Sequence, residues 1–430
     1  MSTSQSIAIL GGGASGLVLA RTLADRGFSR VVVFEREATV GGKACTIEID
    51  GRAHDLGATM GVPIDYDRVV ALGREGGIAT TAFPDEQHVS LATGRPRALN
   101  RWHELPRVLV ETAKYIALHR RCWDERGLHH ADPQLFAPWS DVVARHGLHA
   151  ANKRMLCYRT GYGYGFDDEV PAVMYASLIR PQTLRGLAAG APFMWSGGTQ
   201  PIWTGLAARL AARVEIRTRS AITRIARDAT GVSITCGARV ERFDRVAITC
   251  DPQLLLPVLD VSASERHWFA QVRTYPYATF ACEVDGLASG RASVGYCDEN
   301  MQRERAGHPM AWVKRYADSN LFVFHLFAPP ELDDAAILAR IAGDVARLGG
   351  RLVACRAARR WRFFPHFTSA FMQRGGLADL DAWQGRSNAF LVGEVLSFAT
   401  MARVTEHAVA MANRIARMPL RAAVTASLAS

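Results

Sequence analysis

The chain has 430 residues, of which 49% are hydrophobic and 21% are charged, with 37 glycines and 18 prolines. These values exclude a small disulfide-stabilised scaffold, a collagen-like repeat and a disordered chain, and they predict two or three folded domains. The formal charge of +10 comes from scattered arginines, since the sequence holds only four lysines and no run of five basic residues. We therefore expect no nucleic acid partner, and a general attraction to anionic molecules or surfaces.

The eight cysteines are spread along the chain without a C-x-x-C pair or an adjacent histidine at metal-ligand spacing. Neither a zinc site nor a disulfide framework is indicated, so we expect a protein of the reducing cytoplasm with no bound metal. No stretch of 18 uncharged apolar residues is present, which predicts that the chain does not span a membrane.

The first sixty residues have the pattern of a dinucleotide-binding unit. An apolar run at 7–10 precedes the sequence GGGASG at 11–16, a segment with helical spacing, and a second β-rich run at 31–34 that ends at Glu35. Strand, glycine turn and helix in this order bring backbone amides to the positive end of a helix, where a pyrophosphate binds. The pattern predicts a Rossmann-type domain.

The glycines at 11–16 have the G-x-G-x-x-G spacing. Among Gly11, Gly13 and Gly16, one makes the tight turn, one lets amides approach the pyrophosphate, and one lets the helix lie close to the strand. Ala14 and Ser15 belong to the same turn and are expected cofactor contacts. The carboxylate of Glu35 is expected to accept hydrogen bonds from ribose hydroxyls.

The sequence after Glu35 favours FAD over NAD. Arg36, Gly42 and Lys43 lie in REATVGGK at 36–43, which resembles the R-x-x-x-x-G-G-[RK] signature of the flavin amine oxidoreductase superfamily. HDLGATMG at 54–61 is similar to the next element of that superfamily, in which the backbone turns beneath the flavin. The resemblance implies that the cofactor is contacted here by four residues in a row: Gly57, Ala58, Thr59 and Met60.

The C-terminal region fits the same resemblance. A strand at 388–394 ends at Glu394, and a helix is predicted over 401–417. In the resembled proteins, Gly-Glu meets the ribityl phosphate and the helix directs its N-terminus, here with Met401 and Val404, at the flavin, where its dipole stabilises negative charge. The resemblance also implies a backbone contact to adenine near Ile222. No cysteine lies in this C-terminal segment, so we expect FAD to be bound non-covalently.

The fold class that follows is α/β, amine-oxidase-like: a discontinuous Rossmann-type FAD-binding domain with an inserted mixed-sheet substrate domain and a helical cap. We assign 1–83, 196–255 and 385–430 to the FAD-binding domain and 97–195 to the cap. The substrate-binding domain is assigned to 84–96 and 256–384, with strands at 277–284 and 321–326 and a helix at 332–348.

Aromatic residues gather near the expected cofactor segments. Each alone is as readily a core residue, but as a set they are expected to wall an apolar substrate tunnel. The set is Tyr162, Tyr164, Phe166, Phe193, Trp195, Trp203 and Phe398, together with FFPHF at 363–367.

A combination of motifs, in order along the chain, is similar to the FAD-dependent polyenoic fatty acid isomerases of the linoleate isomerase type. The motifs are GK at 42–43 with GATMGVP at 57–63, GYG at 163–165 with VPA at 170–172, GGTQ at 197–200, NM at 300–301 with RAGH at 305–308, FPH at 364–366, and GE at 393–394 with SF at 397–398. The resemblance implies a redox-neutral reaction, in which flavin N5 takes a hydride from the methylene between two alkenes and returns it to another carbon. A hydrocarbon C–H is too weak an acid for a histidine or carboxylate near neutral pH, so no catalytic side chain is assigned.

Two features separate this sequence from the proteins it resembles. Many amine oxidases place a lysine beside the flavin on a substrate-domain strand, but the corresponding stretch at 275–282 has none, and Lys314 is expected at the surface. The fatty acid isomerases hold the carboxylate with an arginine from an early strand, but the equivalent stretch at 84–89 has no arginine. Arg180 and Arg185 are the substitutes to test, and an ester, a carrier-bound acyl chain or a polyene are the alternative substrates.

Two further functions stay open: an FAD-dependent oxidase or desaturase of an apolar substrate or amine, and a non-catalytic flavoprotein or lipid-binding module. Residues 97–123 interleave arginines with apolar side chains, which allows weak contact with an anionic membrane surface or a solvated cap helix.

Overall fold

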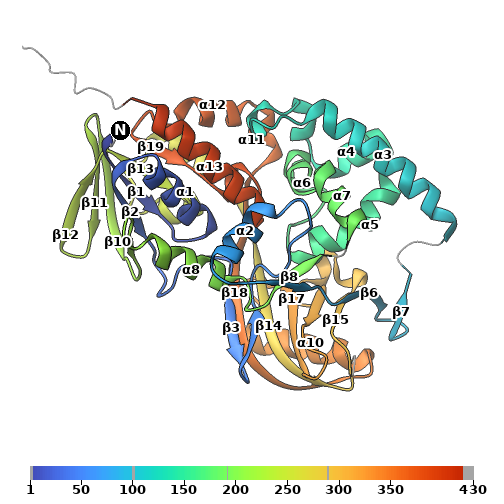
Figure 1. Cartoon of the computed structure of the whole chain (residues 1–430). Coiled ribbons are helices and arrows are strands. Elements are labelled where there is room, and N and C mark those ends of the chain that lie inside the picture. Colours follow the sequence, from blue (N-terminus) through green and yellow to red (C-terminus); the bar gives the residue numbers. More distant parts are fainter. Residues whose placement is uncertain (1–2, 99–101, 191, 288–289, 420–430) are drawn as a thin grey trace, which may run out of the picture.

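The computed structural model describes residues 3–98, 102–190, 192–287 and 290–419. A parallel sheet lies at the centre of one part of the molecule, in the strand order β19-β13-β1-β2-β9 (Figure 1). Its strands are β1 (Thr3–Leu10), β2 (Phe28–Phe34), β9 (Glu215–Arg217), β13 (Arg245–Ile248) and β19 (Ala389–Leu391). The two ends of the chain and its middle therefore build one sheet.

The side chains of β1 alternate between two cores because successive residues of a strand point to opposite faces. Ile7 and Ile9 pack with α1 (Ala14–Asp25), α8 (Gln200–Leu210) and α13 (Met401–Arg417). Ala8 and Leu10 pack in a second core that includes the antiparallel strands β10 (Ile222–Asp228), β11 (Gly231–Cys236) and β12 (Arg239–Phe243). Both faces of the parallel sheet are thus covered, which is the usual state of such sheets.

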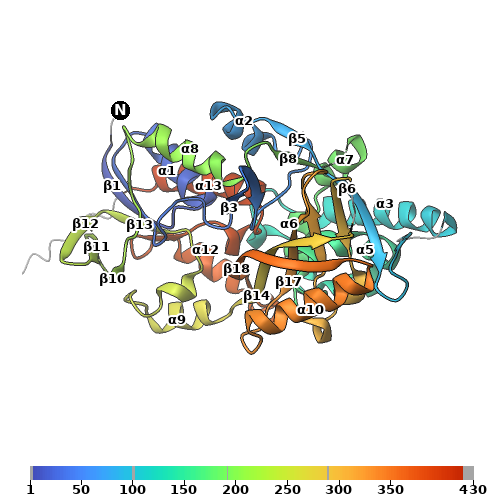
Figure 2. The ribbon, with the colours of Figure 1, turned by 90° about the horizontal axis from the view of Figure 1, so that it is seen from below.

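A seven-stranded mixed sheet forms the second part of the molecule (Figure 2). In spatial order its strands are β18 (Arg351–Phe367), β14 (Val272–Asp285), β17 (Leu321–Phe327), β16 (Ala311–Lys314), β15 (Ser293–Tyr296), β6 (Asp85–Ser90) and β7 (Arg95–Arg97). Helix α10 (Asp334–Arg347) covers one face, where Ile337 and Ile341 pack with Phe280 and Phe324.

Five helices form a cap beside both sheets (Figure 1). They are α3 (Leu105–Cys122), α4 (Trp139–His146), α5 (His149–Arg159), α6 (Ala172–Leu178) and α7 (Pro181–Ala189). The chain returns from the cap through β8 (Phe193–Trp195), which pairs with β5 (Thr80–Ala82). The remaining helices and strands are β3 (Thr46–Ile49), β4 (Arg52–Asp55), α2 (Asp67–Glu75), α9 (Ala263–Ala270), α11 (Ser369–Gln373) and α12 (Gly376–Trp383).

The α/β, amine-oxidase-like fold class is confirmed, and the helix predicted over 401–417 has those bounds. The expectation for Lys314 is wrong. Lys314 is only 3% exposed, because β16 is an inner strand of the seven-stranded sheet. Its ammonium group donates a hydrogen bond to the Ala317 carbonyl oxygen. All eight cysteines are free thiols. Within the described ranges no helix has the length and apolar character needed to cross a bilayer.

Candidate active site

A cavity of 500 Å³ lies where the parallel sheet, the cap and the seven-stranded sheet meet, and we call it the main cavity. At one end the turn between β1 and α1 forms its wall. Gly11 has φ +117°, and a Cβ on Gly16 would stand 1.9 Å from the Gly11 carbonyl oxygen, so only glycine lets α1 lie this close. A Cβ on Gly13 would meet only Gly42 Cα, at 3.8 Å, which leaves the turn open toward the cavity.

The first turn of α1 carries donors without acceptors. The helix has no side-chain N-cap and no acidic residue in its first turn. Ser15 Oγ is buried and has no hydrogen-bond partner among the described residues, and Ser15 lines the cavity. Orphan amides, a free hydroxyl and the positive end of a helix dipole together fit a phosphate group.

The carboxylate of Glu35 is fixed at the end of β2. It accepts hydrogen bonds from the backbone amides of Gly12 at 2.7 Å and Glu37 at 2.8 Å, and the residue is 8% exposed. An oriented carboxylate with spare lone pairs fits the hydroxyls of a ribose. The turn therefore offers sites for both the sugar and the phosphates of a dinucleotide.

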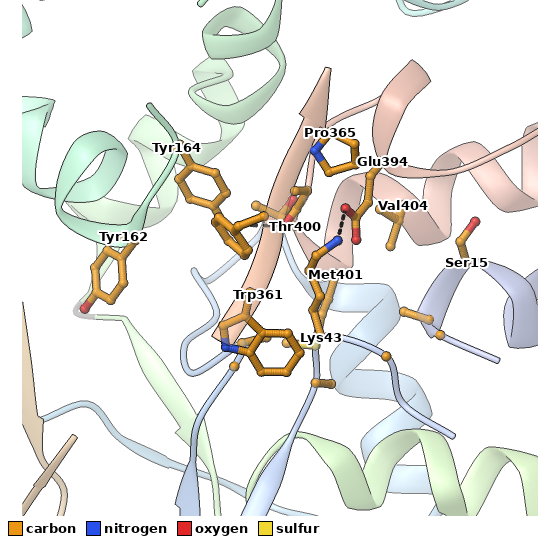
Figure 3. A pocket seen from close by; sticks show the side chains of 18 of the residues that line it. Ser15, Lys43, Tyr162, Tyr164, Trp361, Pro365, Glu394, Thr400, Met401 and Val404 are labelled. Atoms are coloured by element: carbon orange, nitrogen blue, oxygen red, sulfur yellow. Dashed lines mark hydrogen bonds and ion pairs between the residues drawn. The ribbon is translucent and has the colours of Figure 1, made fainter. Parts of the chain in front are cut away.

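An ion pair joins the two ends of the chain at this site. Lys43 Nζ lies 2.5 Å from a carboxylate oxygen of Glu394, and in Figure 3 the pair stands between Ser15 and the two labelled tyrosines. The backbone at Lys43 is fixed by a hydrogen bond, which its carbonyl oxygen accepts from the Ala58 amide at 2.9 Å. The N-terminus of α13 borders the same cavity through Thr400, Met401 and Val404.

The other end of the cavity is walled by aromatic rings. Phe363 stacks on Tyr277 with ring centroids 4.9 Å apart and lies 5.3 Å from Tyr164, and Tyr162 lies 5.4 Å from His325. We call these five residues the aromatic cluster. They come from the cap and from strands β14, β17 and β18, which is why all three parts of the fold are needed to close the site.

The aromatic cluster is uncharged near neutral pH. Burial raises the pKa of its tyrosines above the ordinary value and lowers the pKa of His325 to about 4. The hydroxyl of Tyr277 and Nδ1 of His325 share a hydrogen bond of 2.8 Å, while His325 Nε2 has no partner among the described residues. This end of the cavity favours an apolar molecule.

Most of the cofactor residues predicted from the sequence line the main cavity: Gly11, Gly13, Ala14, Ser15, Glu35, Arg36, Gly42, Lys43, Gly57, Ala58, Thr59, Met60, Glu394, Met401 and Val404. Gly16 lies beneath the turn. Ile222 begins β10 and is not in the wall, although the amide of nearby Ser220 donates to the Glu35 carbonyl at 2.8 Å. The adenine contact at Ile222 stays a prediction.

Of the predicted substrate residues, Tyr162 and Tyr164 line the cavity. Phe398 lies behind the wall, 4.7 Å from the Tyr164 ring, and Phe166 packs on Phe327 at 5.0 Å. Phe193 and Trp195 pack on each other at 5.2 Å, outside the wall.

The two predicted arginines also lie outside the wall of the main cavity. Arg180 forms ion pairs with Glu125 at 3.4 Å and Glu406 at 3.2 Å, and its guanidinium lies over the Trp123 ring. Arg185 is exposed on α7. Both are engaged with solvent or with other side chains.

Phe363, from the aromatic set expected near the cofactor, lines the cavity, whereas sequence reasoning missed Tyr277, His325 and Trp361, which line it too. Aromatic residues two positions apart on one strand share a face, and the pair at 361 and 363 carried that signal. Nothing in the sequence showed which face of β18 would meet β14.

The model of the family described as flavin containing amine oxidoreductase matches residues 14–416. A crystal structure of a CLA-producing fatty acid isomerase from P. acnes superimposes with a TM-score of 0.89 at 26% identity, covering 96% of this chain and 99% of that one. A redesigned putrescine oxidase has a TM-score of 0.71 at 17% identity, covering 96% and 98%. Cyclohexylamine oxidase from Brevibacterium oxydans superimposes with a TM-score of 0.68 at 14% identity, covering 96% of this chain and 100% of that one. No curated protein matches the chain. The resemblance to the fatty acid isomerases is confirmed; the likeness to the two oxidases extends to the fold alone.

Proposed function

The chain belongs to the flavin containing amine oxidoreductases, and from this premise we propose that it is an FAD-dependent isomerase that moves a double bond in a polyunsaturated fatty acyl or polyene substrate. The observation that carries the proposal is the aromatic cluster, which offers rings and neutral hydroxyls where a substrate would meet the flavin. The isomerase of similar structure adds support.

FAD, when bound, supplies a two-electron centre that can take up a hydride and give it back. The residues of this chain that would hold it are Ser15 and the α1 amides, which suit the phosphates, and Glu35, which suits the ribose. Cys250 is the cysteine in the described wall, and it stands beside Gly11, where burial raises its thiol pKa to about 12. Its place beside the nucleotide turn, and not beside the aromatic cluster, supports non-covalent binding.

The aromatic cluster suits a substrate that becomes positively charged. Loss of a hydride from a methylene between two alkenes leaves a delocalised cation, and ring faces stabilise cations by about 0.5 to 2 kcal/mol each. The rings of Tyr164, Tyr277 and Phe363 also exclude water that would trap such a cation. Neutral His325 adds no competing positive charge at pH 7.

Anaerobic incubation of the flavin-loaded protein with a panel of methylene-interrupted dienes and trienes tests the proposal. We expect products of unchanged mass with new conjugated-diene absorbance and no net flavin reduction. Hydrogen peroxide in air, or stoichiometric reduction of an acceptor with loss of two mass units, would assign an oxidase or desaturase instead. If no polyene or amine changes the absorbance spectrum of the flavin, the protein is a non-catalytic flavoprotein or lipid-binding module.

A further inference from the structure

A second cavity of 410 Å³ lies inside the cap, between α3, α5 and α7, and we call it the cap cavity. Four residues border both cavities: Met155, Tyr158, Ile179 and Leu187. The wall of the cap cavity is largely apolar: Val108, Tyr115, Trp139, Leu148, Leu184 and Pro192. A chain-like molecule at the aromatic cluster can therefore extend past these shared residues into the cap.

One fully buried cation stands in this apolar wall. Arg159 has a 0% exposed side chain and lines the cap cavity. Its Nη2 donates to a carboxylate oxygen of Asp167 at 3.2 Å and to the Asn152 carbonyl at 3.4 Å. Its Nε and Nη1 have no hydrogen-bond partner among the described residues.

Two unpaired donors on a buried guanidinium are costly unless a ligand accepts from them. The rings of Tyr175 and Trp139, 4.8 and 5.6 Å from the guanidinium carbon, contact the guanidinium but supply no lone pair. Either of these donors can give a charge-assisted hydrogen bond to a carboxylate oxygen, while Nη2 stays paired with Asp167. The geometry of Arg159 suits a carboxylate that enters with an apolar tail.

Two other charged residues line the cap cavity, Glu86 and Arg154, and neither competes with Arg159 for a bound carboxylate. Strand β6 contributes an acid, Glu86, which accepts hydrogen bonds from Tyr158 at 2.7 Å and Tyr296 at 2.5 Å. Arg154, five residues before Arg159 on α5, also lines this cavity, is exposed and has no ion pair with the described residues. A second cation at the rim favours an anion on its way in.

We propose that the cap cavity holds the carboxylate of the acyl substrate, bound by Arg159, while the chain runs past Met155 and Ile179 to the aromatic cluster. This inference rests on the proposed function, since it assigns a free fatty acid as the substrate class. An ester lacks the negative charge that Arg159 would pair with, so the site discriminates against esters.

Binding of an unreactive probe tests the site without turnover. On the flavin-loaded protein, isothermal titration calorimetry with laurate and methyl laurate should show the acid binding at least about tenfold more tightly, as a charge-assisted hydrogen-bonded pair requires. In Arg159→Met the preference should fall to within about twofold through loss of laurate affinity, with Arg159→Lys between. Arg145→Met, which removes an exposed arginine of α4, should keep the full preference.

Equal affinity for acid and ester in the unaltered protein, or an unchanged preference in a folded Arg159→Met, would overturn the proposal. If Arg159→Met does not fold, Ala151→Phe decides, because Ala151 lines the cap cavity and a ring there fills it. We expect laurate binding to weaken about tenfold in Ala151→Phe, and unchanged binding would overturn the site.

The failure of this site and the failure of the proposed function are distinguishable. A protein that prefers laurate to its ester but shifts no double bond retains the site and loses the function. A protein that isomerises dienes without that preference retains the function and loses the site.

Discussion

Among the residues of the main cavity, Ser15 has the environment that most directly indicates a phosphate ligand. Its hydroxyl is buried against the cavity with no partner among the described residues. Because a hydrogen bond to a charged group contributes about 1.5 to 3 kcal/mol, we expect Ser15→Ala to weaken FAD binding about tenfold or more while the apoprotein melts as before. Fluorescence titration of the apoprotein with FAD measures this. Unchanged affinity would show that the hydroxyl does not meet the cofactor.

Buried histidines make the fold sensitive to acid. Burial lowers the pKa of His325, His366 and His407 to about 4, from an unfolded value near 6.5. Between these pH values the unfolded chain binds protons that the folded chain does not, so stability falls as the pH falls through this window. We expect a loss of about 1 to 2 kcal/mol per histidine between pH 7 and pH 5, measured by urea unfolding.

A matched variant identifies the source of that acid sensitivity. Replacing His325 by Asn removes one of these buried groups and should make the pH dependence shallower between pH 7 and pH 5. A stability that is flat or rises toward pH 5 would contradict the assignment of neutral, buried imidazoles.

Helix α3 is the element with two apolar faces. Val108, Thr112 and Tyr115 line the cap cavity, while Leu109 is 70% exposed and Trp102, just before the helix, is 83% exposed. Exposed basic residues of the same helix, Lys114, Arg120 and Arg121, give it the character of an interfacial helix. We propose that this face contacts anionic lipid, beside the cavity into which an apolar substrate would pass.

Co-sedimentation with phosphatidylserine-containing vesicles tests the α3 contact. We expect binding that weakens several-fold in Leu109→Ser, Trp102→Ser and Arg120→Glu, and that is absent on neutral phosphatidylcholine vesicles. Val240→Ser is the control, because Val240 is 67% exposed on β12, away from the cap. Equal binding of all variants would discard the contact.

The elements at the two ends of the chain and part of the aromatic cluster could be predicted, whereas the way in which the strands complete that cluster could not. The turn at 11–16 and the helix at 401–417 are defined by local residue types and spacing, so Gly13, Glu35 and Met401 were found from the sequence. Tyr277, His325 and Phe363 come from three strands whose pairing is set by tertiary contacts, with irregular register between β14 and β18. The sequence alone does not indicate which residues of these strands pair with one another.

At the scale of the whole molecule, the site exists only because distant segments meet. Lys43 and Glu394 are 351 positions apart and form one ion pair, and the cap lies between the early and late strands of the second sheet in the chain. Arg159 illustrates the consequence. Its place on a helix with no motif gave no reason to single it out, and only the packing of α3, α5 and α7 around it shows a buried cation beside a cavity.

The most direct measurement follows one atom. The flavin-loaded protein is incubated without oxygen with a methylene-interrupted diene acid carrying deuterium on the central methylene, and the product is examined by mass spectrometry and NMR. We expect a conjugated diene that keeps every deuterium, with one of them moved to a different carbon. A product that has lost two hydrogen or deuterium atoms, or deuterium exchanged into water, would contradict hydride shuttling within a closed aromatic site.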